Sequence, residues 1–182
     1  MSDSWQVLVR RALLERRPWI AVWEERVRLP NGAVIEDYFG LHLRSWVAVF
    51  AVSEEGRVPL VWQYRHGVRA HSLELPAGYL EDGEDALECA RRELREEVGC
   101  AAQFFRLLRS HPVMPERSAM TMHLVLAQGA RTVGAPQPDE TEQLAVRWLG
   151  LDELRATWRA GGILSVGHAA AIAWGLDAVG AL

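Results

Sequence analysis

The chain has 182 residues, of which 49% are hydrophobic and 24% are charged. This composition is typical of a soluble globular protein and excludes collagen-like, low-complexity and disordered chains. The formal net charge of −4 lacks the basic excess that attracts nucleic acid or acidic membranes, so we expect neither as a partner.

The sequence carries no recognisable signal for export or membrane insertion. The N-terminus lacks a basic region followed by an apolar core, and the apolar run over residues 47–52 is far too short to span a membrane. The Ala-rich stretch over residues 163–182 contains His168, Asp177 and several glycines, which predicts a terminal packing helix. Cys89 and Cys100 form neither a disulfide framework nor a zinc motif. We therefore expect a cytoplasmic protein.

Hydrophobic periodicity predicts strands first and helices interspersed later in the chain. The expected strands cover residues 19–23, 33–39, 47–52, 58–64, 104–108, 121–127 and 144–149. Apolar spacings of three and four predict helices over residues 84–98, 151–159 and 165–176. This order indicates an α+β fold, with an N-terminal β-rich element over residues 1–44 and a larger domain over residues 45–182.

Two local signals refine these elements. Pro30-Asn31-Gly32 lies between the first two expected strands and is a hairpin turn signal. Asp82 is expected to cap the start of the first helix and Gly99 to end it.

The first predicted helix carries three glutamates on one side. Glu93, Glu96 and Glu97 share an arc of roughly 100°, where like charges repel and raise one another's pKa. An all-oxygen set without histidine or cysteine favours a hard divalent cation, Mg²⁺ or Mn²⁺, whose other ligands are commonly phosphate oxygens. The alternative is a solvated helix face, ion-paired with the arginines of the same helix.

The segment from Gly78 to Cys100 resembles the Nudix hydrolase box, G-x5-E-x7-R-E-U-x-E-E-x-G-U. The specified positions are met by Gly78, Glu84, Arg92, Glu93, Leu94, Glu96, Glu97 and Gly99. The only departure is Cys100, where the box prefers an aliphatic residue, and cysteine packs as a small hydrophobe.

The resemblance implies an α/β/α sandwich with a mixed sheet that holds two or three metal ions. It implies that Glu93 and Glu97 are the principal ligands, and that Glu96 and the carbonyl of Ala77 are further ones. Glu84 and Arg92 are expected to form a structural pair. These roles come from the family and are not worked out from the spacing.

Other segments are similar to those of ADP-ribose pyrophosphatases within the same family. Gln63-Tyr64-Arg65 and Leu73-Glu74-Leu75-Pro76-Ala77-Gly78 match two of their motifs, and Glu116-Arg117-Ser118 resembles part of their active-site loop. Pro115 lies where that subfamily carries a marker proline, with Pro112 as a competing candidate. The resemblance makes Arg65 and Glu116 candidate substrate-binding residues.

The segment Asp139-Glu140-Thr141-Glu142 lies where these enzymes have an acidic loop. Glu140, Glu142 and Glu96 are the candidate catalytic carboxylates, and we favour Glu140 over Glu142 as the group that accepts the proton of the attacking water. The alternatives are a simple ion pair for Arg65 and a solvated acidic loop for the two glutamates.

The sequence therefore predicts a divalent-metal hydrolase of a nucleoside diphosphate derivative. The favoured reaction converts ADP-ribose to AMP and ribose 5-phosphate in a homodimer that associates through the N-terminal β element. Alternative substrates are GDP-mannose or another nucleotide sugar, and FAD. A non-catalytic nucleotide sensor is a further alternative, disfavoured because every box carboxylate is present.

Overall fold

The computed structural model describes residues 4–182, which form two compact units. The first, called the N-terminal unit here, runs to Ser45 and also contains Pro112–Thr121. The second, the main unit, comprises Trp46–His111 and Met122–Leu182. No linker or composition change in the sequence marks the inserted segment 112–121, so only the folded chain reveals where it belongs.

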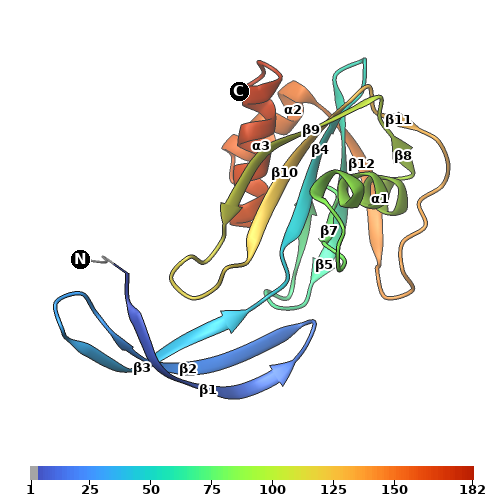
Figure 1. Cartoon of the computed structure of the whole chain (residues 1–182). Coiled ribbons are helices and arrows are strands. Elements are labelled where there is room, and N and C mark those ends of the chain that lie inside the picture. The colour runs from blue at the N-terminus through green and yellow to red at the C-terminus, as the bar shows by residue number, and fades with distance from the viewer. Residues whose placement is uncertain (1–3) are drawn as a thin grey trace. The chain divides into compact units, whose positions relative to one another are not determined.

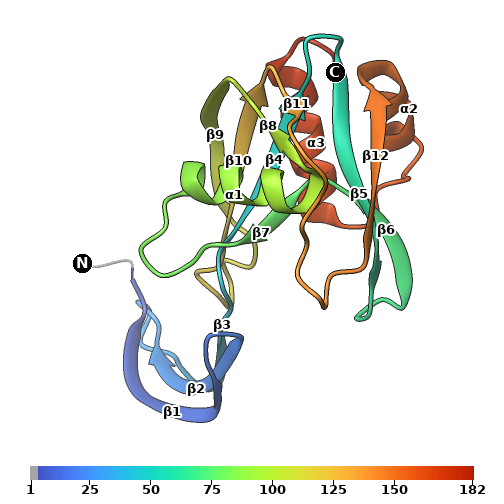
Figure 2. The same cartoon turned by 90° about the vertical axis from the view of Figure 1, so that its right-hand side faces the viewer.

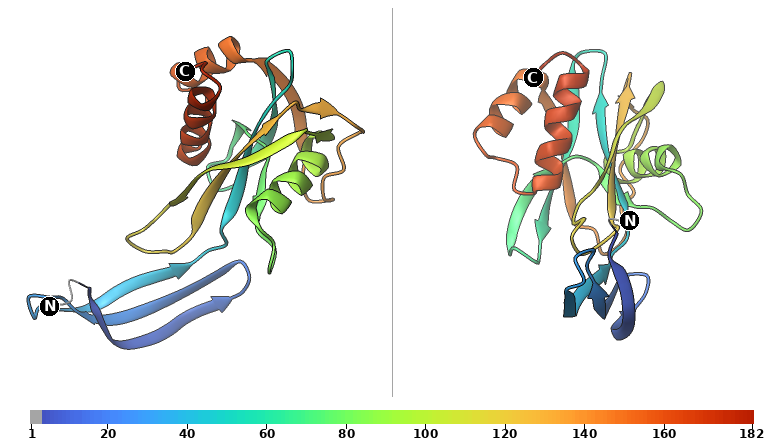
Figure 3. Two further views of the ribbon diagram at one scale, coloured as in Figure 1. Left: turned by 45° about the horizontal axis from the view of Figure 1, so that its top comes forward. Right: turned by 60° about the vertical axis from the view of Figure 1, so that its left-hand side comes forward.

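The N-terminal unit is a three-stranded antiparallel sheet in the order β1-β2-β3 (Figure 3). The strands are β1 (Gln6–Arg16), β2 (Ile20–Arg28) and β3 (Val34–His42). The expected turn at residues 30–32 is confirmed by a bond of 2.8 Å from the Leu29 amide to the Ala33 carbonyl. The sequence did not single out β1, because its Arg-, Ala- and Leu-rich second half has the composition of a helix, and strand pairing overrides that propensity.

The main unit contains two larger sheets and a small strand pair. One sheet has the order β7-β4-β10-β9, with β7 (Ala77–Tyr79), β4 (Trp46–Val52), β10 (Thr121–Gln128) and β9 (Phe104–Pro112). The second has the order β12-β5-β6, with β12 (Leu144–Gly150), β5 (Arg57–Arg65) and β6 (Ala70–Glu74). The small pair joins β8 (Cys100–Ala101) to β11 (Arg131–Thr132). Because β4 pairs parallel with β10 and antiparallel with β7, the first sheet is mixed.

Helices cover both sides of this mixed sheet (Figures 1 and 2). Successive side chains of β4 point to opposite faces. Val47 and Val49 pack in one core with Leu94 of α1 (Ala86–Val98). Ala48 and Phe50 pack in the other core with α2 (Leu151–Arg159) and α3 (Val166–Ala178). The predicted α+β class and the α/β/α sandwich with a mixed sheet are therefore confirmed.

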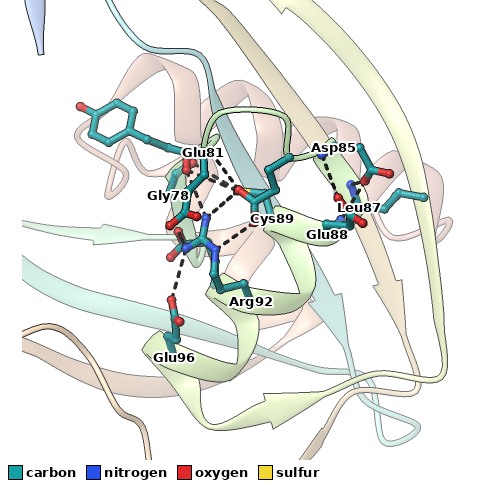
Figure 4. Close-up of polar contacts among 11 residues, drawn as sticks. Gly78, Glu81, Asp85, Leu87, Glu88, Cys89, Arg92 and Glu96 are labelled. Atoms are coloured by element: carbon teal, nitrogen blue, oxygen red, sulfur yellow. Dashed lines mark hydrogen bonds and ion pairs between the residues drawn. The ribbon is translucent and has the colours of Figure 1, made fainter. Parts of the chain in front are cut away.

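The start of α1 differs from the sequence prediction. The N-cap is Asp85, whose carboxylate accepts hydrogen bonds from the Leu87 amide at 2.7 Å and the Glu88 amide at 2.9 Å. Glu88 accepts in return from the Asp85 amide at 3.1 Å, which completes a capping box (Figure 4). The expectation that Asp82 caps the helix was wrong, because the loop makes one more turn before the helix begins.

The end of α1 is as predicted. Gly99 has a φ of 64° and bonds through its amide to the Arg95 carbonyl at 3.0 Å, which is the left-handed cap that glycine favours. Among residues 4–182 we find no helix with the length and apolar content needed to cross a membrane.

Candidate active site

The carboxylates of the predicted metal site lie on the side of α1 that packs in the main unit. Their periodic neighbours Leu94 and Val98 belong to the core, so the helix carries two of the acids inward with them. Glu93 is 7% exposed and Glu97 is 3% exposed, whereas the side chain of Glu96 is 45% exposed. The three residues therefore share one region of the helix but differ strongly in their access to water.

Glu97 is a buried carboxylate with little compensation from the protein. Its Oε2 accepts a hydrogen bond of 2.8 Å from the amide of Ala77, the first residue of β7. Burial, together with the charges of Glu93 and Glu142, raises its pKa to about 8, although the Ala77 amide and the charge of Arg65 act in the opposite direction. A buried carboxylate in this state gains from a cation.

Glu93 lies against the backbone of Gly78. A Cβ atom added at Gly78 would lie only 1.7 Å from Oε1 of Glu93, so no residue with a side chain fits there unless the carboxylate moves. Burial raises the pKa of Glu93, opposed by Arg92 and reinforced by Glu96 and Glu142. This contact gives the first glycine of the box a physical reason, which the sequence alone did not supply.

Arg92 is the centre of the polar contacts between α1 and the segment that precedes it, residues 78–85 (Figure 4). It donates from Nε and Nη2 to Glu84, each at 2.9 Å, which confirms the expected pair, and from Nη2 to the Tyr79 carbonyl at 3.2 Å. Its Nη1 donates to Glu93 at 2.5 Å and to Glu96 at 3.2 Å, which are ion pairs within the helix of the kind that the alternative interpretation of the sequence predicted. The guanidinium thus supplies positive charge between two of the predicted metal ligands.

The donor chemistry of the site fits a divalent cation. Within residues 4–182, no group of three or more acidic, histidine or cysteine side chains is already arranged to hold a metal ion. The available donors are nevertheless carboxylate oxygens, two of them buried and with raised pKa values, and hard cations prefer such donors. Glu93, Glu96, Glu97 and the carbonyl of Ala77 are therefore suited to Mg²⁺ or Mn²⁺ and not to zinc.

Arg65 ends β5 and forms an ion pair with Glu74 of β6. Its Nε lies 3.1 Å from both carboxylate oxygens of Glu74, and its Nη2 donates to Oε2 of the same residue. The side chain of Arg65 remains 46% exposed, and its charge lowers the pKa of Glu97. The ion pair therefore leaves part of the Arg65 side chain accessible, and its charge acts on Glu97 of α1.

The acidic loop lies between β11 and β12 and is exposed at both candidate glutamates. Glu142 accepts a hydrogen bond of 3.1 Å from the Asp139 amide, and its charge raises the pKa of Glu93 and of Glu97. Glu140 is two residues earlier on the same loop. The charge of Glu142 therefore acts on the two buried carboxylates of α1.

Glu116 belongs to the inserted segment of the N-terminal unit and is exposed. Its carbonyl accepts a hydrogen bond from the Tyr38 hydroxyl, and the neighbouring Arg117 lies 4.8 Å over the Tyr38 ring. The structure thus places this candidate substrate-binding residue in a different unit from the α1 carboxylates.

Comparisons with known proteins agree with this geometry. The sequence profile of the NUDIX domain matches residues 42–165. An ADP-ribose pyrophosphatase of Mycobacterium tuberculosis is 35% identical over 135 residues, which is 73% of this chain and 65% of that protein. An ADP-ribose pyrophosphatase of Bacillus subtilis is 35% identical over 109 residues, covering 60% of this chain and 58% of that protein. The chain therefore spans about two thirds or less of the length of these relatives.

A solved structure extends the likeness to the fold. A crystal structure titled ADP compounds hydrolase superposes with a TM-score of 0.84, covering 98% of this chain and 97% of that chain. The sequence identity of this pair is 21%, so the likeness concerns the arrangement of helices and strands.

Proposed function

The chain belongs to the NUDIX family of hydrolases, and we propose that its substrate is ADP-ribose, which it cleaves to AMP and ribose 5-phosphate. The pyrophosphatase names of the two bacterial relatives support this substrate. One observation carries the proposal: Glu93 and Glu97 are buried acidic side chains with raised pKa values, and the charge of Arg65 acts on Glu97. This arrangement suits a diphosphate and its cation.

We infer that Mg²⁺, or Mn²⁺ in its place, is held by Glu93, Glu97, Glu96 and the Ala77 carbonyl, with two or three ions in the complete site. Nudix hydrolases generally use a divalent metal, and the oxygen donors of α1 fit such an ion. When bound, the cation neutralises phosphate charge and acidifies water. Gly78 lies against Glu93, and Arg92 binds Glu93 and Glu96, so these two residues help to keep both ligands in place.

The remaining proposed roles belong to residues that approach the substrate. Arg65 presents a planar guanidinium that matches phosphate oxygens. The sequence favours Glu140 as the acceptor of the water proton, but we propose Glu142 instead, ahead of Glu140 and Glu96, because the charge of Glu142 acts on both buried carboxylates. Water adds across the diphosphate: one new P–O bond forms, the bridging P–O bond breaks, and the leaving phosphate takes a proton. The substrate contact of Glu116 stays a prediction that comes from the family resemblance alone.

The test is product analysis with purified protein. We expect AMP and ribose 5-phosphate from ADP-ribose in the presence of Mg²⁺, and no turnover in EDTA. A parallel panel contains GDP-mannose and FAD at the same concentrations. If either compound has a higher kcat/KM than ADP-ribose, that compound is the substrate instead. Binding without turnover of any compound would indicate a nucleotide sensor.

We propose further that the protein is a cytoplasmic homodimer that associates through the N-terminal unit. Its sheet exposes large apolar side chains, including Val9 at 57% and Trp19 at 64%, and such a surface is costly in water. Light scattering coupled to gel filtration should give twice the chain mass, and Val9→Asp should shift the protein towards monomer. A monomeric wild type would contradict the proposal.

A further inference from the structure

Glu74 is an acidic residue that the proposed chemistry does not use. It lies at the end of β6, is 2% exposed, and is three residues before the predicted backbone ligand Ala77. A buried carboxylate is costly unless it is well hydrogen-bonded. The hydrogen-bond partners of the Glu74 carboxylate therefore indicate its role.

Donors from one strand, β5, and one helix, α3, converge on this carboxylate. Gln63 donates to Oε2 from Nε2 at 3.3 Å, and Arg65 binds both oxygens. From α3, Nε2 of His168 lies 3.3 Å from the same Oε2. Burial alone would raise the pKa of Glu74, but the hydrogen bond from Arg65 and the nearby positive charge lower it overall. Glu74 is therefore an anion held by fixed donors.

The state of His168 follows from its second contact. The amide of Leu75 donates to Nδ1 at 3.2 Å, so Nδ1 carries no proton and the ring hydrogen is on Nε2, directed at Glu74. Burial lowers the pKa of His168 to about 4, which keeps the ring neutral at pH 7. The ring also packs 5.2 Å from that of Trp46. One tautomer of His168 is thus fixed by the backbone and by Glu74.

We propose that His168 and Glu74 are positioning residues that fix the orientation of the Arg65 guanidinium for a substrate phosphate. His168 and Gln63 both contact Oε2, and these contacts hold the carboxylate in one orientation for its hydrogen bonds with Arg65. The exposed part of the guanidinium is then aimed before substrate arrives, which saves the entropy of ordering a long side chain. This inference rests on the proposed function for the identity of the substrate and for the contact of Arg65 with its phosphate.

We call this arrangement, in which His168 fixes Glu74 and Glu74 fixes Arg65, the relay. Steady-state kinetics on four variants test it. We expect Glu74→Gln to raise the KM for ADP-ribose about tenfold with kcat within about twofold, because ground-state positioning is lost. His168→Phe keeps a ring beside Trp46 but loses both hydrogen bonds, and should raise KM about threefold. His168→Gln can accept from Leu75 and donate to Glu74, so it should restore most of the KM. Asp152→Asn, an exposed carboxylate change on α2, is the matched control.

A double-mutant cycle separates this role from general stability. If Glu74 acts through Arg65, Glu74→Gln should add less than about twofold to the KM of Arg65→Ala. Independent, multiplicative effects of the two substitutions would overturn the relay, as would a KM unchanged in both Glu74→Gln and His168→Phe. Melting temperatures of all variants identify any loss that comes from unfolding.

A second measurement does not depend on turnover. In ¹H–¹⁵N spectra, the Nε–H of Arg65 should exchange slowly with water, lose that protection in Glu74→Gln, and lose part of it in His168→Phe. Rapid exchange in the wild type would overturn the relay even if ADP-ribose is hydrolysed. Slow exchange in the wild type that becomes fast in these variants would support the relay even if the substrate is another diphosphate. The two proposals can therefore fail separately.

Discussion

The main unit contains two almost equally buried glutamates whose pKa values move in opposite directions. Glu74 on β6 is 2% exposed and Glu97 on α1 is 3% exposed. Glu74 receives hydrogen bonds from Arg65, Gln63 and His168, and its pKa is lowered overall. Glu97 receives one backbone hydrogen bond, is surrounded by like charge, and its pKa is raised to about 8.

The difference shows that burial alone does not decide the charge state of a carboxylate. The protein provides the compensating donors at Glu74, so this residue can serve as a fixed structural anion. At Glu97 the compensation is incomplete, and a divalent cation from solution can complete it. Hydrogen-bond donors of the protein therefore stabilise the charge of Glu74, whereas a charged Glu97 would need a cation from solution. Each prediction below tests one side of this contrast.

The largest expected effect is on turnover in Glu97→Gln. An amide cannot replace a charged metal ligand, so we expect kcat to fall about 10³-fold or more. The metal-free variant should nevertheless unfold at a temperature no lower than the wild type near pH 7, because the raised pKa keeps Glu97 mostly protonated there and glutamine resembles that neutral form. Activity assays and thermal unfolding in EDTA check the two results. Turnover close to wild type would contradict the metal assignment.

The same substitution should abolish stabilisation by metal. Mg²⁺ at a hundred times its dissociation constant should stabilise the wild type by about 2.7 kcal/mol, since it binds only the folded chain. Differential scanning calorimetry with and without Mg²⁺ measures this shift in melting temperature. Asp152→Asn should keep the full shift, and a shift in Glu97→Gln as large as in the wild type would place the ion elsewhere.

Gly78→Ala tests the position of the neighbouring ligand without changing any charge. The new methyl group would overlap Oε1 of Glu93, so the carboxylate must move. A displacement of about 1 Å in a positioned group can cost about 10²-fold in rate, which is the loss we expect in kcat. Gly134→Ala is the matched control, because its added Cβ meets no atom within 4 Å. Equal activity in both variants would contradict the close contact.

On the other side of the contrast, Glu74→Gln should lower stability. Removing one partner of a buried ion pair costs several kcal/mol, but Arg65 is half-exposed and solvent screens it. We therefore expect about 2 kcal/mol less free energy of unfolding, measured by urea denaturation. A loss within about 0.5 kcal/mol would mean that the anion at Glu74 contributes no stability.

The two carboxylates should also give opposite pH dependence in the metal-free protein. The pKa of Glu97 rises from 4.5 to about 8 on folding, so its contribution to stability is full below pH 4.5 and is lost as pH rises through about 8. The pKa of Glu74 is lowered on folding, so its contribution is present above pH 4.5 and is lost as pH falls. Melting temperatures across this range should lose the alkaline decline in Glu97→Gln and part of the acid decline in Glu74→Gln.

Much of this site could be read from the sequence because it is local. The helix period and the box place Glu93, Glu96 and Glu97 on one stretch of α1, and the pairing of Arg92 with Glu84 follows from the same segment. The strands β4, β5, β10 and β12 were equally visible, since each contains a run of mostly apolar residues.

Contacts between distant segments could not be read in this way. His168 contacts Glu74, which lies 94 positions earlier in the sequence, and no local sequence pattern around either residue predicts this contact. The strands β7, β8 and β11 have two or three residues each, too few for any periodicity. The grouping of Pro112–Thr121 with the N-terminal unit likewise depends on tertiary contacts, such as the bond of 2.7 Å from the Leu41 amide to the Arg117 carbonyl.

The smallest expected effect concerns the residue that starts α1, where sequence reasoning was wrong by three positions. Asp85 satisfies two helix amides, so Asp85→Ala should cost about 1 kcal/mol of unfolding free energy, whereas Asp82→Ala should stay within about 0.5 kcal/mol. Because α1 carries Glu97 and not Glu74, fraying its first turn should weaken Mg²⁺ binding slightly while the protection of the Arg65 Nε–H is unchanged. Urea denaturation, Mg²⁺ titration and hydrogen exchange on the two variants measure this. If Asp82→Ala proved the more damaging, the helix would begin where the sequence first indicated.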